Sequence, residues 1–140
     1  MAQCVDDVID SVDIAVFTAA VADIRPTEKN EAKTSKGDLP DAIAIERTRD
    51  ILKTICDRQQ RPFCVGFAAE TGDLDVRTIE KCRRKGCDLI VGNDVAKGAG
   101  FGTEDNAVVI ADRDAVLARF GPASKIEVAQ EIWRVVVEKI

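Results

Sequence analysis

Short apolar runs of strand length alternate along this chain with longer segments of helical periodicity, and this alternation limits the possible folds more than any other feature. The apolar runs are residues 14–20, 62–68 and 88–91, and each is typical of a strand buried on both faces. Helical patterns over 48–60 and 74–85 separate them. Such alternation predicts a mainly parallel sheet flanked by helices.

The last third of the chain indicates a different local arrangement. Residues 107–110 and 115–120 have the pattern of a β-hairpin. Ser124 is a suitable N-cap for a last helix over 125–138. The residues expected to face inward from this helix are Ile126, Ala129, Ile132 and Trp133. We therefore expect a Rossmann-like α/β fold with a C-terminal hairpin, and because 140 residues suit one core, a single domain over residues 1–140.

Two polar or glycine-rich segments interrupt this pattern. Residues 23–41 are expected to form a long loop, followed by a short strand over 42–47 with Ile43 and Ile45 on one face. A second loop is expected over 93–105. A long loop in a compact domain is more often a lid or a binding loop than filler.

Composition excludes several classes of function. The net charge of -5 disfavours nucleic acid and anionic membranes as partners, and no apolar run approaches the roughly 18 residues of a membrane span. The absence of histidine excludes a Ser-His-Asp triad and a histidine-based zinc site. Five cysteines without a CxxC motif favour small, mostly buried thiols in a reducing, cytoplasmic setting.

Ligands of such sheets bind beyond the carboxyl ends of the strands. Asp23 ends the small-residue segment there, and Phe67 lies among small residues that leave space for its ring to stack on a base. The basic residues available to phosphates are Lys33, Lys36, Lys81 and Lys85. From the residues alone, an N-cap role for Asp23, core packing for Phe67 and a solvated face for the lysines remain open.

Six segments carry a family resemblance when they are taken in order. They are AAVADIRP (19–26), KTSK (33–36), RDIL (49–52), VGFAAET (65–71), DLIVGNDV (88–95) and GFGTEDNA (100–107). In this order the chain resembles phosphopantothenoylcysteine synthetase, also called phosphopantothenate–cysteine ligase, over essentially its whole length. That domain commonly forms the C-terminal half of a bifunctional coenzyme A biosynthesis flavoprotein.

The resemblance implies a ligase, unrelated to the ATP-grasp enzymes, that joins 4′-phosphopantothenate to L-cysteine with CTP and Mg²⁺. The pantothenate carboxylate attacks the α-phosphate to give an acyl-cytidylate and pyrophosphate, and the cysteine amine then displaces CMP. Such chemistry needs cations around phosphates more than acid and base groups, which suits a chain without histidine. The resemblance also implies a homodimer and no metal ligand from the protein itself.

The resemblance also assigns roles to residues. Lys33 matches the first lysine of the family's KxKK loop and is the expected catalytic residue, in a loop that orders over the intermediate. The residues expected to bind the nucleotide are Ala19, Asp23, Lys33, Arg49, Asp50, Ile51, Leu52, Phe67, Lys81 and Lys85. Two positions depart from the family pattern, because Ser35 stands at a KxKK lysine and Arg49 stands at the usual proline. The family's N-terminal Gly-rich turn has no counterpart in these residues.

Two other functions remain open. The chain could be a non-catalytic module that binds nucleotide weakly or assembles with a partner that supplies further strands. It could also be a nicotinamide-dependent oxidoreductase domain, although no GxGxxG follows a first strand. A binding titration that compares CTP, ATP and NAD would separate these possibilities.

Overall fold

A computed structural model describes residues 1–28, 32, 33, 35, 40–95 and 105–140. The chain divides into two compact units, which are described separately below. The first comprises residues 1–19 and 51–140, and the second comprises residues 20–50. The expected loop over 93–105 lies mostly outside the described residues, since only its ends at 93–95 and 105 are described.

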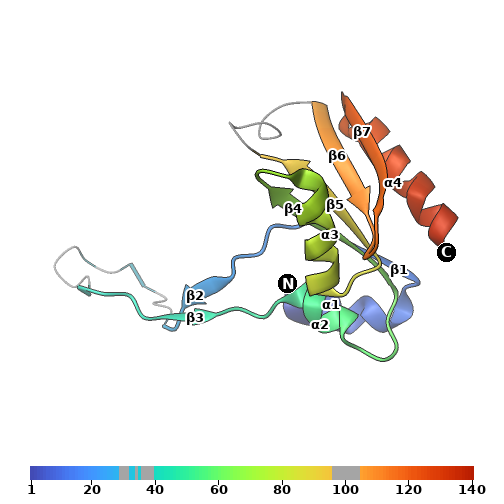
Figure 1. Ribbon diagram of the computed structural model, residues 1–140. Helices are drawn as coiled ribbons and strands as arrows, with labels where there is room; N and C mark the ends of the chain where they lie inside the picture. The colour runs from blue at the N-terminus through green and yellow to red at the C-terminus, as the bar shows by residue number, and fades with distance from the viewer. Residues whose placement is uncertain (29–31, 34, 36–39, 96–104) are drawn as a thin grey trace. The chain divides into compact units, whose positions relative to one another are not determined.

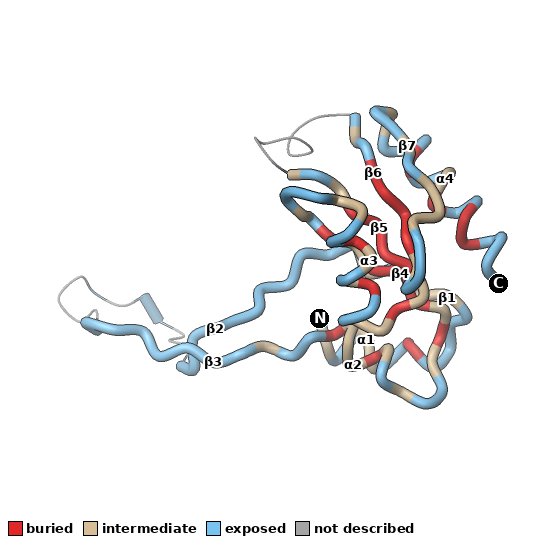
Figure 2. The backbone as a smooth tube through the Cα atoms, in the orientation of Figure 1, coloured by how far each residue is buried: buried red, intermediate tan, exposed pale blue. Residues whose placement is uncertain are grey.

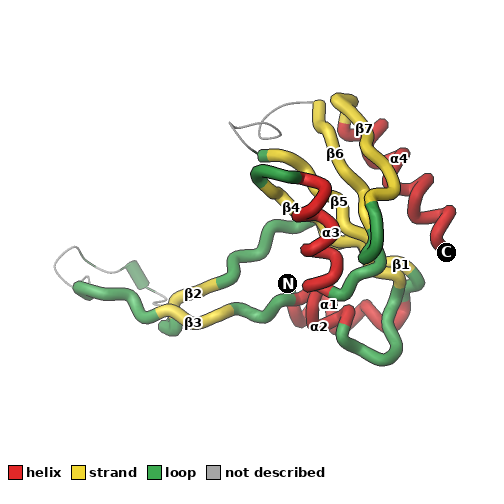
Figure 3. Tube along the Cα trace, in the orientation of Figure 1, coloured by secondary structure: helices red, strands yellow, loops and turns green. Residues whose placement is uncertain are grey.

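A five-stranded mixed sheet forms the centre of the first unit (Figure 1, Figure 3). Its strands, in spatial order, are β1 (Ile14–Phe17), β4 (Phe63–Glu70), β5 (Leu89–Asp94), β6 (Asp105–Ala111) and β7 (Val116–Ser124). The β1–β4 and β4–β5 pairs are parallel, whereas β6 and β7 form an antiparallel hairpin beside β5. The α/β class, the parallel central strands and the C-terminal hairpin expected from the sequence are therefore confirmed.

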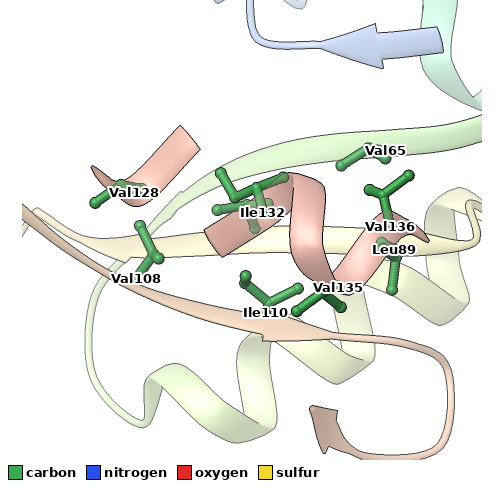
Figure 4. Packing of buried hydrophobic residues seen from close by; sticks show 9 residues of the cluster. Val65, Leu89, Val108, Ile110, Val128, Ile132, Val135 and Val136 are labelled. Carbon is green, nitrogen blue, oxygen red and sulfur yellow. The ribbon is translucent and has the colours of Figure 1, made fainter. Parts of the chain in front are cut away.

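One face of this sheet packs against the C-terminal helix α4 (Lys125–Lys139). Figure 4 shows valine, leucine and isoleucine side chains of the strands meeting those of the helix. The buried residues of this cluster are Val65, Leu89, Val91, Val108, Ile110, Val128, Ile132, Val135 and Val136. Such close-packed aliphatic contacts supply most of the stability of a domain of this size.

The opposite face packs against the remaining helices. These are α1 (Ala2–Val8), the short 3₁₀ helix η1 (Ile9–Ser11), α2 (Ile51–Cys56) and α3 (Leu74–Lys85). Their cluster contains Ile9, Ile55, Cys64, Ala68, Cys82, Cys87 and Ile90. Three of the chain's five cysteines are therefore buried core residues, as the sequence predicts.

The ends of the two long helices follow their capping residues. The Asp73 side chain accepts a hydrogen bond from the Val76 amide, and Gly86 ends α3 in the left-handed conformation with φ 74°. At α4, Ser124 and Glu127 form a reciprocal capping box. Both helices were expected within one residue of their observed bounds because these local signals are strong.

The prediction of which α4 residues point inward is only partly correct. Ile132 is buried, but Ile126 and Trp133 are 73% and 49% exposed and Ala129 is exposed too. Helix α4 carries two apolar stripes, and the one that meets the sheet contains Val128, Ile132, Val135 and Val136. Helical spacing alone does not decide between two such stripes.

Two further expectations need correction. The first strand is not buried on both faces, because β1 is the outer strand of the described sheet and Val16 is 42% exposed. Helix α2 is shorter than the predicted 48–60 and ends at Cys56. Beyond it, Arg58 makes ion pairs with Asp6 and Asp10, which hold the chain in a polar turn rather than a further helical turn.

The second unit is a small antiparallel ribbon within the segment expected to be mostly loop. Strand β2 (Ile24–Pro26) pairs with β3 (Ile45–Arg47), and Arg25 Nε lies 2.6 Å from Glu46 Oε1. All six strand residues are exposed (Figure 2). The predicted strand over 42–47 is thus confirmed only in its last three residues.

Candidate functional site

The carboxyl ends of the parallel strands meet at one edge of the sheet, where α/β folds bind ligands. There, β4 and β5 remain paired up to Glu70 and Asp94. The Val95 amide then donates to the Glu70 carbonyl oxygen at 3.0 Å, which continues the pairing by one residue. Backbone hydrogen bonds therefore fix the position of Glu70 at the candidate site. Glu70 ends the strand, and the N-cap of α3 is Asp73.

A row of cations runs along α3, from a point beside this edge toward the opposite end of the sheet. Arg77, Lys81 and Lys85 follow one another at four-residue intervals and so share one side of the helix. Lys81 Nζ lies 2.9 Å from Glu70 Oε1, and Arg77 Nη1 lies 4.0 Å from Glu70 Oε2. The Lys81 and Glu70 side chains are only 23% and 14% exposed. We call Arg77, Lys81 and Lys85 the basic row.

The structure adds two residues to the expected site, Arg77 and Glu70. Arg77 could have been found from the sequence, because it precedes Lys81 by the same four residues that separate Lys81 from Lys85. The contact of Glu70 with Lys81 joins a strand end to a helix eleven residues later. No periodic pattern in the sequence reports such a contact.

The start of α2 lies against β4 on the same face as α3. A Cβ atom added to Gly66 would lie 2.6 Å from Leu52 Cδ2 and 2.9 Å from Ile90 Cδ1. Glycine at position 66 therefore allows Leu52 to approach the strand backbone, and Ile51 beside it is 8% exposed. Two of the expected nucleotide-binding residues are thus placed on this face of the sheet.

Phe67 lies on the other face. Successive strand residues point to opposite sides of a sheet, and Phe67 is half-buried against the core that contains α4. Gly66 and the basic row belong to the face that contains α2 and α3. The structure therefore does not bring Phe67 beside Lys81 on one face, and a ligand that contacts both would have to cross the strand ends.

The remaining expected site residues lie in exposed segments. Ala19 ends the N-terminal segment of the first unit and is exposed. Asp23, Lys33, Arg49 and Asp50 belong to the second unit and are also exposed. The Asp23 carbonyl oxygen accepts from the Thr48 amide at 2.9 Å, which fixes this residue at the end of the ribbon. Lys36, part of the KTSK segment, lies outside the described residues.

At the opposite end of the sheet, an ion pair joins Arg61, just before β4, to Asp88, just before β5. The Arg61 guanidinium donates to both carboxylate oxygens of Asp88, and the Cys64 amide donates to Asp88 Oδ2 at 2.8 Å. Burial raises the pKa of the Asp88 carboxyl, but Arg61 and the Cys64 amide more than offset it, so the pKa lies below its ordinary value. This pair is structural, because it lies at the start of β5 and away from the candidate site.

We expect Asp88→Asn to lower the free energy of unfolding at pH 7 by about 1–3 kcal/mol, since it removes a charged acceptor of three hydrogen bonds. A carboxyl whose pKa is depressed by folding stabilises the protein above its unfolded pKa, and this contribution is lost as pH falls through the folded pKa. The parent and the variant should therefore converge in urea titrations as pH falls from 6 to 2. Asp114→Asn, at an exposed position near the same end, is the control. An unchanged difference across that range would contradict the assignment.

Within the described residues, His, Cys, Asp and Glu side chains form no group of three or more suited to a metal ion. No helix in the described ranges is long and apolar enough to cross a membrane.

The fold and the basic row define a class of protein: a Rossmann-like α/β domain with cations at the ligand-binding edge of its sheet. Residues 1–140 match the family described as DNA/pantothenate metabolism flavoprotein C-terminal domain. The chain belongs to this family.

Relatives of known sequence and structure agree with this assignment. The chain is 41% identical over 133 residues to the coenzyme A biosynthesis bifunctional protein CoaBC of Bacillus subtilis, which covers 94% of this chain and 33% of the relative. It is 34% identical over 148 residues to the protein of the same name from Mycobacterium tuberculosis, which covers 98% of this chain and 35% of the relative. The chain therefore spans about a third of the length of these relatives.

A solved structure described as the C-terminal domain of coenzyme A biosynthesis bifunctional protein CoaBC superposes with a TM-score of 0.74. It is 31% identical in sequence, and the match covers 96% of this chain and 58% of that one. A second, the DNA/pantothenate metabolism flavoprotein from Streptococcus pneumoniae, has a TM-score of 0.72 at 15% identity and supports the fold alone.

Proposed function

We propose that this chain is the nucleotide-binding portion of a CTP-dependent phosphopantothenate–cysteine ligase that acts in coenzyme A biosynthesis. The observation that carries the proposal is the basic row on α3, in which Arg77 and Lys81 contact Glu70 at the carboxyl edge of the sheet, Lys81 at 2.9 Å. Two of its members, Lys81 and Lys85, are also the positions that the family resemblance assigns to the triphosphate. Membership of the family and its coenzyme A-related relatives support the same function.

The basic row would bind the β- and γ-phosphates of CTP. An ammonium group has three donors, so Lys81 can keep its hydrogen bond to Glu70 and still donate to phosphate oxygens. Arg77 and Lys85 extend the positive charge on either side by one helical turn each. Cations fixed in this way reduce the repulsion between the triphosphate and an incoming carboxylate, and they stabilise the pyrophosphate that leaves.

Lys33 would act at the reacting phosphate. In the first step a carboxylate oxygen of 4′-phosphopantothenate attacks the α-phosphorus, the bond to pyrophosphate breaks and an acyl-cytidylate forms. Negative charge on the α-phosphate oxygens increases in this step, and the Lys33 ammonium would stabilise it. In the second step the cysteine amine attacks the acyl carbon, loses a proton and displaces CMP.

Mg²⁺ would arrive with the nucleotide. It is commonly bound through substrate phosphates, a few carboxylates and several waters rather than by an all-protein cage. When bound, it neutralises phosphate charge and orients the triphosphate. We propose no protein ligand for it. A homodimer is likewise a proposal from the family resemblance, as are 4′-phosphopantothenate and cysteine as further substrates.

Calorimetric titration tests the choice of nucleotide. With Mg²⁺ present, CTP should bind more tightly than NAD, because the basic row matches a triphosphate and the chain has no dinucleotide fingerprint. ATP in a parallel titration measures discrimination between bases, and a repeat with EDTA measures the contribution of the metal. NAD binding as tight as that of CTP would overturn the proposal. Binding of CTP without any turnover, even when the remaining region of the relatives is supplied, would favour a non-catalytic module.

A further inference from the structure

Two buried thiols meet where α3 ends. Cys82 lies in the last turn of the helix, and Cys87 follows the cap residue Gly86. Their Sγ atoms are 3.8 Å apart, and both residues are 0% exposed. Neither residue has a part in the proposed nucleotide site.

The helix cap brings the two sulfurs together. Gly86 has φ 74°, and its amide donates to the Cys82 carbonyl oxygen at 2.9 Å. This left-handed cap turns the chain back, so the residue after it packs against the residue that begins the last turn. Cys56 Cβ would lie 3.7 Å from a Cβ atom added to Gly86, so the cap is also packed from the side of α2. The thiol pair is therefore held by backbone geometry and not by flexible side chains alone.

The two thiols have different acidities. The Cys87 thiol donates to Cys82 Sγ, which lowers the pKa of Cys82 and raises the pKa of Cys87. Burial opposes the first change, and the nearby Arg113 guanidinium supports it. Arg113 is fixed there, since it donates to the Gly86 carbonyl oxygen at 2.5 Å and to that of Cys87 at 3.3 Å. The Cys82 thiol also donates to the Cys87 carbonyl oxygen at 3.3 Å. A thiol of lowered pKa that contacts a second thiol can act as the nucleophile of the pair, with the second thiol as the resolving group, once a small oxidant reaches it.

A shallow cavity, open to solvent, lies beside this cap, and neither cysteine lines it. Its volume is about 230 Å³, and its lining includes Arg113, which contacts Cys87, and Asp88, the next residue along the chain. A small neutral oxidant in this cavity would be separated from the thiol pair by these side chains.

Cys56 and Cys64 form a second pair in the same core, and there too a hydrogen bond lowers the pKa of one thiol, Cys64, while raising that of the other.

We propose that Cys82 and Cys87 are an oxidation site, at which a small hydroperoxide converts the two thiols into an intramolecular disulfide across the α3 cap. This inference is independent of the proposed function, because it requires no nucleotide. The sulfurs must approach from 3.8 Å to about 2.05 Å. That change requires side-chain rotation and a small adjustment of the cap.

The chemistry proceeds in two balanced steps. The Cys82 thiolate attacks one peroxide oxygen, the O–O bond breaks, the departing oxygen takes a proton to leave as water, and Cys82 becomes a sulfenic acid. Cys87 sulfur then attacks the Cys82 sulfur and loses its proton, the S–O bond breaks and a second water leaves. Two thiols are oxidised and one hydrogen peroxide is reduced to two waters.

Peptide mapping tests the proposal on the unmutated chain. The reduced protein is treated with hydrogen peroxide, blocked with N-ethylmaleimide in denaturant and digested with trypsin. Cleavage after Lys81, Arg83 and Lys85 separates the dipeptide 82–83 from the peptide 86–97, so these two peptides stay joined only if the disulfide has formed. We expect the joined species, its loss after dithiothreitol treatment, and blocked thiols at Cys56 and Cys64.

Variants assign the roles of the two thiols. With Cys87→Ser, dimedone should label Cys82 as a sulfenic acid, whereas with Cys82→Ser it should not label Cys87. Cys4→Ser, at an exposed position on α1, should leave the joined peptides unchanged. The proposal is overturned if Cys82 and Cys87 stay reduced at a peroxide dose that oxidises Cys4, if Cys82 proceeds to sulfinic acid without a disulfide, or if Cys56 and Cys64 join first.

Discussion

Lys33→Gln should lower kcat of the ligase reaction by about two to three decades, the loss typical when one electrostatic contact to a transition state is removed. The CTP dissociation constant should change less than about tenfold. The difference arises because negative charge on the α-phosphate is greater in the transition state than in bound CTP. An interaction that strengthens along the reaction lowers the barrier without much tightening of substrate binding.

The structure shows Lys33 exposed in the second unit, and its neighbours in the sequence include Ser35 where the family has a lysine. With one ammonium fewer in the segment, the contribution of Lys33 should be larger rather than shared. A second variant, Ser35→Lys, restores the family pattern and should raise kcat in the Lys33→Gln background if this segment acts on the phosphate. No increase would mean that position 35 cannot substitute for position 33.

The measurement needs a protein that also supplies the region of the relatives beyond this chain, because the chain spans about a third of their length. Steady-state release of pyrophosphate gives kcat, and calorimetry gives CTP affinity. Lys125→Gln removes the same charge at an exposed position on α4 and should change neither value. If kcat survives in Lys33→Gln, or if CTP binding accounts for the whole loss, Lys33 is not the catalytic residue.

Local signals explain why much of the fold could be predicted from the sequence. Helix α3 has an N-cap at Asp73 and a left-handed glycine at its end, so both bounds follow from side-chain and backbone chemistry within a few residues. Strands β4 and β5 are apolar runs covered on both faces, as their composition indicates. These elements required no knowledge of tertiary contacts.

The sequence-based predictions were wrong where several local structures fit the sequence and a tertiary contact selects one of them. In α4, two apolar stripes satisfy helical periodicity, and only packing against the sheet selects the stripe with Val128 and Ile132. In β1, an apolar run predicts burial on both faces, but this strand is the outer one of the described sheet. The ribbon that contains β2 was missed because its residues are exposed, and hydrophobic periodicity reports only buried faces.

In the candidate site, too, local spacing predicted some residues, whereas others depend on tertiary contacts. The four-residue spacing on α3 predicted that Lys81 and Lys85 share one side of the helix. The same spacing, extended one turn toward the N-terminus, also includes Arg77. The contact of Glu70 with Lys81 depends on how β4 and α3 pack, so the sequence alone did not indicate it. The opposite-face position of Phe67 was predictable in principle from strand alternation, but only after the face of β4 that α3 covers is known.

Lys81→Ala should weaken CTP binding by about one to two decades and CMP binding much less. An ammonium on the β- or γ-phosphate has no partner in CMP, and a charge-assisted hydrogen bond contributes roughly 1.5–3 kcal/mol. Lys85→Ala should show the same preference for the triphosphate. Because Lys81 also holds Glu70, its removal leaves a carboxylate that is only 14% exposed near the phosphates. Lys81→Ala should therefore have the larger effect of the two.

Two controls separate phosphate binding from damage to α3. Arg83→Ala removes the same charge from the far side of this helix, where Arg83 donates to the Arg113 carbonyl oxygen, and should leave the ratio of CTP to CMP affinity unchanged. Glu70→Gln in the Lys81→Ala background removes the remaining carboxylate and should recover part of the lost CTP affinity, because its charge repels the triphosphate. If Lys81→Ala weakens CTP and CMP by the same factor, the lysine does not contact the terminal phosphates. The basic row would then stabilise the fold at Glu70 rather than bind nucleotide.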